Sequence, residues 1–188
     1  MTMVQFIDGP HAAARVALLT SMHTRNCIAL PTISCMIALN KGRSLQMTWA
    51  TERLDLLKAG SAVLPPVVQT LQLGGLDDWG SGWVRKRWVP NPELLNVDGS
   101  LFGGYLTALA DQAAAFAAMT VVPDDMVFRT TSLTMNFVRV GRVEALLIEA
   151  RVVAQTRQMI TCRVELKREN DELIAEASSQ QLLLPMKA

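Results

Sequence analysis

The sequence predicts an α+β domain in which a curled antiparallel β-sheet wraps around one central α-helix. Three observations favour this fold. An alanine-rich helical segment covers residues 105–119, four strand-like runs joined by short polar turns follow it, and half of the 188 residues are hydrophobic. That share is enough for one buried core. A run of strands that follows an apolar helix can bury that helix by curling around it as one sheet.

The central helix is predicted from its composition. Residues 105–119 contain no proline or glycine, and Thr107 is their only β-branched residue, so helix propensity is high. Asp111 is the only charged side chain between Asp98 and Asp124. A carboxylate in an apolar helix is costly to desolvate unless it has polar partners or a chemical role. Composition alone leaves both readings of Asp111 open, a solvated or capped residue and a catalytic one.

The pair Gly103-Gly104 lies where this helix begins. The first N–H groups of a helix have no internal partner and carry partial positive charge, and glycine lets another atom approach them closely. The pair is therefore either an ordinary tight turn or an oxyanion-binding corner. Asp111 follows Gly103 by eight residues, which is about 80° beyond two full turns and about 12 Å along the helix axis. A site that uses both residues would need a second copy of the chain, which predicts a homodimer.

Two shorter helices are expected before the central one. Leu54 and Leu57 recur on one helical face, with Thr51 as the expected N-cap and Gly60 as the expected C-cap. Pro65-Pro66 begins the second helix, because proline is tolerated in the first helical turn.

One strand is predicted before the central helix and four after it. Residues 79–89 form the first, with Gly80 and Gly82 as bulges and with Arg85, Lys86 and Arg87 on its solvated face. Polar and apolar residues alternate clearly over 161–167, and the breaks between the later runs are short and polar, as hairpins require. The four later strands are expected at 127–140, 145–156, 159–167 and 173–184.

Composition argues against several classes of partner and chemistry. The formal net charge of +1 indicates neither a nucleic-acid nor a membrane-surface partner, and no apolar run reaches the roughly 18 residues of a membrane span. Cys27, Cys35 and Cys162 lack metal or redox spacing, which fits a reducing, cytoplasmic setting. Both histidines, His11 and His23, lie near the N-terminus. This placement argues against a Ser-His-Asp hydrolase and against most zinc sites.

Residues 1–46 are expected to form an N-terminal extension ahead of a domain at 47–188. The extension holds one acidic residue, Asp8, against several basic ones. Such a composition is typical of a transit peptide. The favoured interpretation is a segment with little fixed structure, or one upstream of a later start at Met47.

The run Asn96, Gly103-Gly104 and Asp111 resembles the signature of hotdog-fold acyl-CoA thioesterases of the PaaI-like branch. In that family a pattern of the form N-x5-H-G-G-x6-D opens the central helix. The residues here fall on it at matching spacing, except that Phe102 stands where the family has histidine. The resemblance extends from Asn96 to the end of the last predicted strand. It implies a hotdog fold and an enzyme that hydrolyses acyl-CoA thioesters to free acid and coenzyme A.

The resemblance also implies catalytic roles for individual residues. Asp111 would act as nucleophile or general base, the Gly103 N–H would stabilise the thioester oxyanion, and Asn96 would orient the carbonyl or the water. A strand hydroxyl would position that water. Ser132 is the first candidate for it, and Thr131 is a close competitor because a one-residue slip exchanges the faces of a strand.

The same resemblance implies how the substrate is held. Two arginines at strand ends would meet the phosphates of coenzyme A, although solvated strand ends are an equally good reading of them. The protein would be a homodimer or homotetramer, with no metal and no cofactor besides the coenzyme A of its substrate. The implied substrate contacts are Phe102, Gly104, Thr131, Arg139 and Arg157, and the segment expected over the acyl pocket contributes Leu64, Val67, Val68 and Leu71.

Two other functions compete with hydrolysis. Hotdog hydratases pair a histidine with an acid, and the body of this chain contains no histidine. The second hypothesis is a non-catalytic acyl-CoA binding or sensing protein on the same fold. Phe102 in place of histidine favours it, whereas Asn96, Gly103 and Asp111 together argue against it, because a binder has no need for a desolvated carboxylate beside an acyl chain.

Overall fold

The structure, a computed structural model, describes residues 47–186. The expected N-terminal extension at 1–46 lies outside these residues. The helices are α2 (Trp49–Lys58), α3 (Pro66–Thr70), the 3₁₀ turn η1 (Pro92–Leu94) and α4 (Gly103–Met119), and the strands are β1 (Asp78–Gly80), β2 (Trp83–Trp88), β3 (Met126–Phe137), β4 (Leu146–Gln155), β5 (Met159–Arg168) and β6 (Leu173–Pro185).

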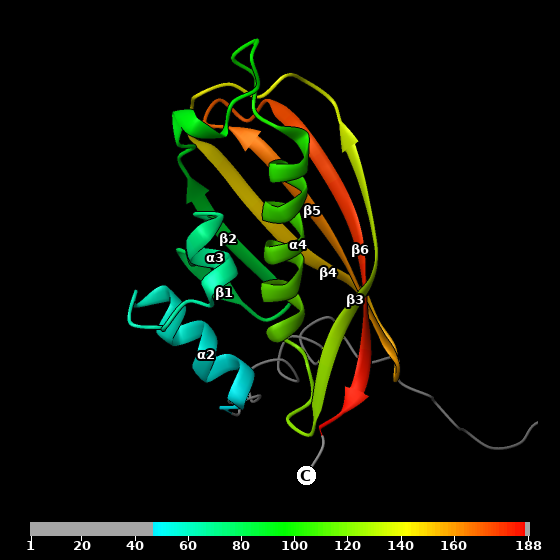
Figure 1. The fold of residues 1–188 in the computed structure, drawn as a ribbon. Helices are drawn as coiled ribbons and strands as arrows, with labels where there is room; N and C mark the ends of the chain where they lie inside the picture. The colour runs from blue at the N-terminus through cyan, green and yellow to red at the C-terminus, as the bar shows by residue number, and fades with distance from the viewer. Residues whose placement is uncertain (1–46, 187–188) are drawn as a thin grey trace, which may run out of the picture. The chain divides into compact units, whose positions relative to one another are not determined.

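The six strands form one antiparallel sheet in the order β1-β2-β4-β5-β6-β3. The sheet curls around α4, the central helix, which packs mainly against β4, β5 and β6 (Figure 1). Because β3 leaves the end of α4 and pairs with β6, it becomes an edge of the sheet. The predicted α+β fold, a curled antiparallel sheet around one helix, is confirmed.

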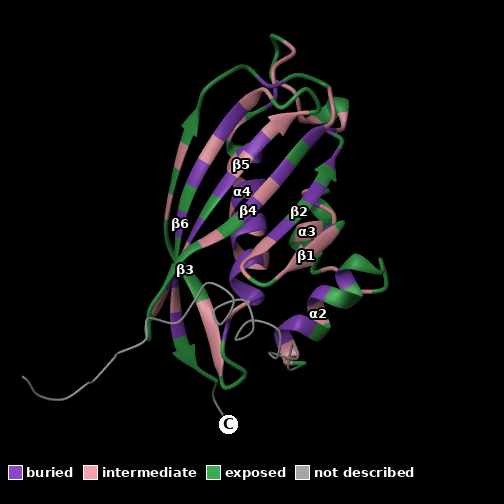
Figure 2. Cartoon of the chain, turned by 180° about the vertical axis from the view of Figure 1, so that it is seen from behind, coloured by how far each residue is buried: buried purple, intermediate pink, exposed green. Residues whose placement is uncertain are grey.

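Alternation and small side chains build the core between helix and sheet. Along β4, Leu146, Ile148 and Ala150 point inward and are buried, and β5 contributes every second residue in the same way. The inward face of α4 is mostly alanine and is fully buried (Figure 2). Alanine lets the helix axis lie close to the sheet, so that the larger strand residues fill the remaining space.

Several expected boundaries needed correction. The N-cap of α2 is Thr48, not Thr51, and the two threonines form a capping box in which each side chain binds the other's backbone N–H. Gly60 follows the C-cap with φ +68°, which is the left-handed conformation that favours glycine there. The prediction of a single strand over 79–89 is wrong, because the chain turns back at Gly82 to make the hairpin of β1 and β2.

Lys86 also differs from its predicted position. It was expected on a solvated strand face with Arg85 and Arg87, but its side chain points inward and is buried, as are those of Val84 and Trp88 on the same face of β2. Only the two arginines are exposed. Strand alternation from Val84 to Trp88 was the signal for this burial, and the run of three basic residues concealed it.

Irregular pairing marks the edge strand. The register of β3 against β6 shifts between Thr130 and Ser132, so Thr131 is the extra residue of a β-bulge. Most of β3 is exposed in the single chain, and its outer edge has no strand partner among residues 47–186. Within the same residues, no helix is long and apolar enough to cross a membrane.

Candidate active site

The first turn of α4 presents two free backbone donors. Phe102 is the N-cap, and its side chain makes no capping hydrogen bond. Its carbonyl accepts from the N–H groups of Tyr105 and Leu106. The N–H groups of Gly103 and Gly104 have no acceptor within residues 47–186. On a helix of 17 residues, such donors attract negative charge.

The surroundings of these donors are tight and apolar. A Cβ on Gly103 would lie 3.2 Å from the ring of Phe137, and a Cβ on Gly104 would lie 2.5 Å from the ring of Phe102. Both aromatic rings are more than half exposed in the single chain. Gly103 and Phe137 line an open hollow of about 310 Å³ together with Arg139 and neighbouring residues.

Asn96 braces the loop that leads into α4. Its side-chain Nδ2 donates to Ser100 Oγ at 2.9 Å and to the Leu101 carbonyl at 3.4 Å. Its backbone closes the same turn, at whose corner Gly99 has φ +76°. Within one chain the Asn96 amide is therefore used to hold the loop, and its role toward substrate stays a prediction.

Asp111 lies two turns further along α4 and is half-buried. Its Oδ1 accepts a hydrogen bond from Thr130 Oγ1 at 2.9 Å. Thr130 Oγ1 is also 3.0 Å from Gln181 Oε1, and Gln181 Nε2 is 2.8 Å from Ser179 Oγ. Gln181 and Ser179 are both completely buried on β6. A polar network thus runs from the core of the sheet to the only carboxylate of the central helix.

The protons of this network can be assigned by counting donors. The Thr130 hydroxyl has one proton, and a carboxylate is the stronger acceptor, so Thr130 donates to Asp111. Gln181 then satisfies all contacts if its amide is turned end for end, which lets it donate to Thr130 and accept from Ser179. In this arrangement each of the three hydrogen bonds between Asp111, Thr130, Gln181 and Ser179 has one donor and one acceptor, as a buried polar network requires.

Within one chain, the hydroxyl beside Asp111 is that of Thr130, which was not among the residues predicted from the sequence. Ser132, the first candidate, lies beyond the bulge and is exposed. Thr131 is the bulged residue, and its Oγ1 donates to the Gln180 carbonyl at 3.2 Å. In a regular strand Thr130 and Ser132 would share one face, because residues two apart do so. The bulge at Thr131 puts them on opposite faces, and it has no recognisable sequence signal here.

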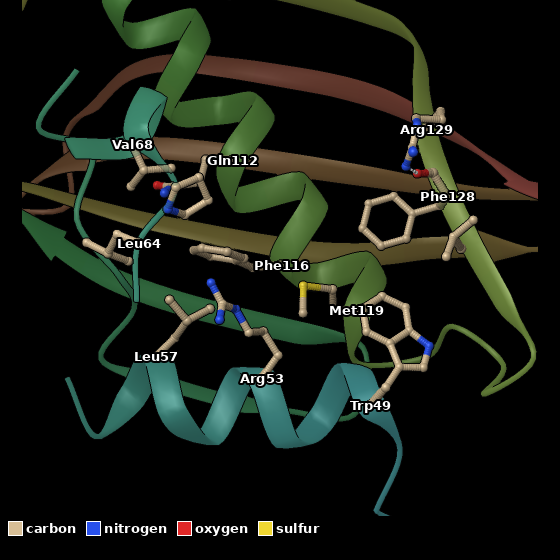
Figure 3. Close-up of a pocket in the computed structure, with 12 residues that line it drawn as sticks. Trp49, Arg53, Leu57, Leu64, Val68, Gln112, Phe116, Met119, Phe128 and Arg129 are labelled. Carbon is tan, nitrogen blue, oxygen red and sulfur yellow. Dashed lines mark hydrogen bonds between the residues drawn. The ribbon is translucent and has the colours of Figure 1, made fainter. Parts of the chain in front are cut away.

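A mostly apolar pocket of about 520 Å³ opens between α2, α4 and β3 (Figure 3), and Asp111 itself does not line it. One wall is the α4 face that begins at Gln112, the next residue along the helix, and another is the part of β3 just before Thr130. Of the residues expected over the pocket, Leu64 and Val68 line it, whereas Val67 and Leu71 do not. The lining residues are Trp49, Arg53, Leu57, Leu64, Pro65, Val68, Gln112, Phe116, Met119, Val127, Phe128 and Arg129.

Gln112 connects this pocket to the buried Lys86. The Lys86 ammonium donates to Gln112 Oε1 at 2.7 Å and to the Leu73 carbonyl, and Gln112 Nε2 donates to the Gly74 carbonyl at 2.9 Å. Burial lowers the pKa of Lys86 to about 8, and the charge of Asp77 opposes this shift. Lys86 therefore ties β2, the 73–74 turn and α4 together at the pocket wall.

The two arginines expected at the coenzyme A phosphates lie at opposite ends of the sheet. Arg139 follows β3 beside the start of β6, where it pairs with Glu172 at 2.8 Å and donates to the Leu173 carbonyl. Arg157 is exposed in the β4–β5 hairpin, next to Met159, which pairs with the end of β6 at Leu182. One chain does not bring them to the same phosphate group. In the described part of the chain, no cluster of three or more metal-binding side chains occurs.

Comparison with known proteins finds a related family. The family model of the thioesterase superfamily matches residues 98–175, which include the start of α4, Asp111 and Thr130. No curated protein matches the chain significantly.

Solved structures share the fold. A phenylacetic acid degradation-related protein from Ralstonia eutropha JMP134 is 24% identical, with a TM-score of 0.62 over 69% of this chain and 98% of that one. A thioesterase family protein from Silicibacter pomeroyi is 20% identical, with a TM-score of 0.62 over 71% and 99%. The protein smu.793 from Streptococcus mutans UA159, solved with acetyl CoA, is 21% identical, with a TM-score of 0.55 over 60% and 90%. The resemblance to PaaI-like hotdog-fold thioesterases is confirmed.

Proposed function

We propose that this chain, which resembles the PaaI-like hotdog thioesterases, hydrolyses acyl-CoA thioesters to the free acid and coenzyme A. One observation carries the proposal. The single carboxylate of the central helix is held by Thr130. Gln112 and Arg129, which adjoin Asp111 and Thr130 in the chain, line a mostly apolar pocket, and the same helix begins with two N–H donors that have no acceptor within residues 47–186. A carboxylate, oxyanion donors and an acyl pocket are the parts that thioester hydrolysis needs.

The reaction follows from the roles of these groups. The Asp111 carboxylate accepts a proton from water, the resulting hydroxide oxygen bonds to the thioester carbonyl carbon, and the carbonyl oxygen becomes an oxyanion. The Gly103 N–H stabilises that oxyanion. The C–S bond then breaks, and the proton held by Asp111 passes to the leaving coenzyme A thiolate. Direct attack by Asp111, with a mixed anhydride that water hydrolyses, uses the same groups and gives the same products.

A second copy of the chain is part of the proposal. Gly103 and Asp111 of one helix are about 12 Å apart along the axis, so one chain does not place both on one thioester. The long edge of β3 is exposed, and long exposed edges are templates for pairing with another strand. Around Gly103, the exposed apolar side chains Phe102, Phe137 and Val138 would be covered by that copy. We infer a homodimer, or a homotetramer built from it, in the cytoplasm.

The test is hydrolysis of a panel of short, medium, long and aromatic acyl-CoAs by the wild type and by Asp111→Asn. Asparagine keeps the shape of the side chain but cannot accept the proton, so we expect turnover to fall at least roughly 10²-fold. Asp125→Asn is the matched control, because Asp125 is an exposed acid in the loop after α4. Light scattering must show the same oligomer for all three proteins. Equal turnover by Asp111→Asn and wild type would contradict the proposal.

Acyl-CoA binding without turnover is the second candidate. Phe102 favours it, because this exposed aromatic ring stands at the family's histidine position and packs over Gly104. Binding of the acyl-CoA panel to the wild type, measured by calorimetry beside the turnover assay, separates the two. Binding without thiol release would make the chain an acyl-CoA binding protein.

A further inference from the structure

The pocket between α2, α4 and β3 has an unusual charge. Ten of its twelve lining residues are uncharged, and the other two, Arg53 and Arg129, are both cations. Neither arginine has a carboxylate within ion-pair distance among residues 47–186. A mostly apolar cavity with positive charge and no negative partner favours an occupant that is itself apolar along its length and anionic at one point.

Arg53 stands within an apolar row of α2. Trp49, Arg53 and Leu57 are spaced four residues apart, so they share one helical face, and all three line the pocket. Figure 3 shows the Arg53 side chain rising from α2 toward Phe116 of α4. Its Nη2 donates to the Val63 carbonyl at 2.6 Å, which fixes the half-buried guanidinium over the cavity. The remaining N–H groups of the guanidinium are available for a carboxylate.

The two arginines occupy different parts of the pocket. Arg129 precedes Thr130 and lies on the β3 wall of the pocket. Arg53 comes from α2, on the wall across from β3 (Figure 3). An acyl chain that enters the pocket past Gln112 meets Phe116 and brings its far end toward Arg53.

We propose that the pocket selects acyl groups with a terminal carboxylate, bound by Arg53, so that the substrate is an ω-carboxyacyl thioester. This inference rests on the proposed hydrolysis and names its substrate class. A carboxylate would accept two parallel hydrogen bonds from the guanidinium, while the methylene chain packs against Leu57, Phe116 and Met119. A chain that ends in a methyl group would instead press against a charged group and strip it of water.

The experiment compares two CoA thioesters of equal length, adipoyl-CoA and hexanoyl-CoA, and a longer pair, sebacoyl-CoA and decanoyl-CoA. The wild type is expected to show a higher kcat/KM for the dicarboxylic member of at least one pair. In Arg53→Met, which keeps the apolar stem, this kcat/KM should fall roughly 10–100-fold, as loss of a charged hydrogen-bond partner does. The kcat/KM for the neutral member should stay the same or rise.

Arg129→Met is the matched control, because it removes the other cation of the same pocket. It should change both members of a pair by the same factor, since the cation assigned to the terminal carboxylate, Arg53, is retained. Thermal melting must show that both variants are folded. An equal loss on both members in Arg53→Met would overturn the proposal and leave Arg53 as a brace for the Val63 loop.

The anion at Arg53 has a second possible source, a phosphate of coenzyme A. Repeating the comparison with pantetheine thioesters of the same acids separates the two, because these lack the nucleotide phosphates. A preference for the ω-carboxyl group that survives in pantetheine thioesters and disappears in Arg53→Met supports the proposal, and one that needs the nucleotide overturns it. If the wild type turns over no member of either pair, the acyl-CoA panel decides separately whether hydrolysis is the function, and calorimetric binding of the same pairs still reports whether Arg53 selects the carboxylate.

Discussion

The hydroxyl of Thr130 lies 2.9 Å from Oδ1 of Asp111 and joins the edge strand β3 to the central helix. This contact orients a carboxylate that α4 alone would leave free to rotate. It also places the carboxylate at the sheet edge, where a second copy of the chain can reach it. The arrangement of the candidate site therefore depends on β3 returning to pair with β6 after leaving the helix.

Replacing Thr130 with valine should lower kcat more than replacing Ser132 with alanine. Valine keeps the β-branched shape but cannot donate to Asp111, so the base loses its orientation, and we expect kcat to fall roughly 10–100-fold. Ser132 lies beyond the bulge, where it pairs with Gln180 instead of Gln181, so Ser132→Ala should change kcat by less than about threefold. Thiol-release kinetics on one acyl-CoA make the measurement. The reverse order of effects would restore Ser132 as the positioning hydroxyl.

Removing Gln181 alone should cost more stability than removing Gln181 and Ser179 together, because both are buried and in contact. Gln181→Met leaves the Ser179 hydroxyl without its partner in the core, so unfolding free energy should fall by about 1–3 kcal/mol. Adding Ser179→Ala removes the stranded group, and the double variant should recover part of that loss. Urea unfolding of the two variants and the wild type tests this. Equal stability of the single and double variants would show that the loss of Gln181 does not leave the Ser179 hydroxyl stranded.

Mixed dimers should regain activity if the site uses both copies. Asp111→Asn and Gly103→Ala are each expected to be poorly active alone. In a mixed dimer one site has both altered residues and the other has neither, and half of the dimers in an equal random mixture are mixed. Activity should therefore return to about a quarter of the wild-type value. A mixture that remains as inactive as its components, with subunit exchange verified by mass spectrometry, would place the whole site in one chain.

Lys86 should make folding stability depend on pH. Its pKa is about 8 in the folded chain, against an ordinary value of 10.5. Between these pH values the unfolded chain binds a proton that the folded chain has lost, so Lys86 adds stability as pH rises, by up to about 3 kcal/mol. Burial raises the pKa of the Cys162 thiol from its ordinary value of 9.0 to about 12. Above pH 9.0 the unfolded chain therefore loses this proton first, and Cys162 lowers stability as pH rises.

The Lys86→Met variant isolates this dependence, because it keeps Cys162. The difference in unfolding free energy, wild type minus variant, should increase from pH 8 to pH 10.5. Chemical denaturation at several pH values measures it. A difference that stays flat over this range would mean that Lys86 keeps its proton in the folded chain, held by Gln112 and the Leu73 carbonyl.

Much of the fold could be predicted from the sequence because its signals are local. Helix propensity over 105–119 and strand alternation over 161–167 report directly on φ and ψ preferences and on one-sided burial. The four later strands lie within a few residues of their expected positions. Asp111 and Gly103 could be selected in the same way, because an isolated charge in an apolar helix and a glycine pair at its start are both visible in one dimension.

Only the tertiary structure decided which residues come together in and around the site. The bulge at Thr131 placed Thr130 rather than Ser132 against Asp111, the turn at Gly82 converted one expected strand into a hairpin, and the packing of α2 turned Arg53 into the pocket wall. Sheet register brought Arg139 and Arg157 to opposite ends. The physical reason is that register, curl and helix docking minimise the free energy of the whole core at once, whereas a stretch of sequence expresses only the preferences of its own residues.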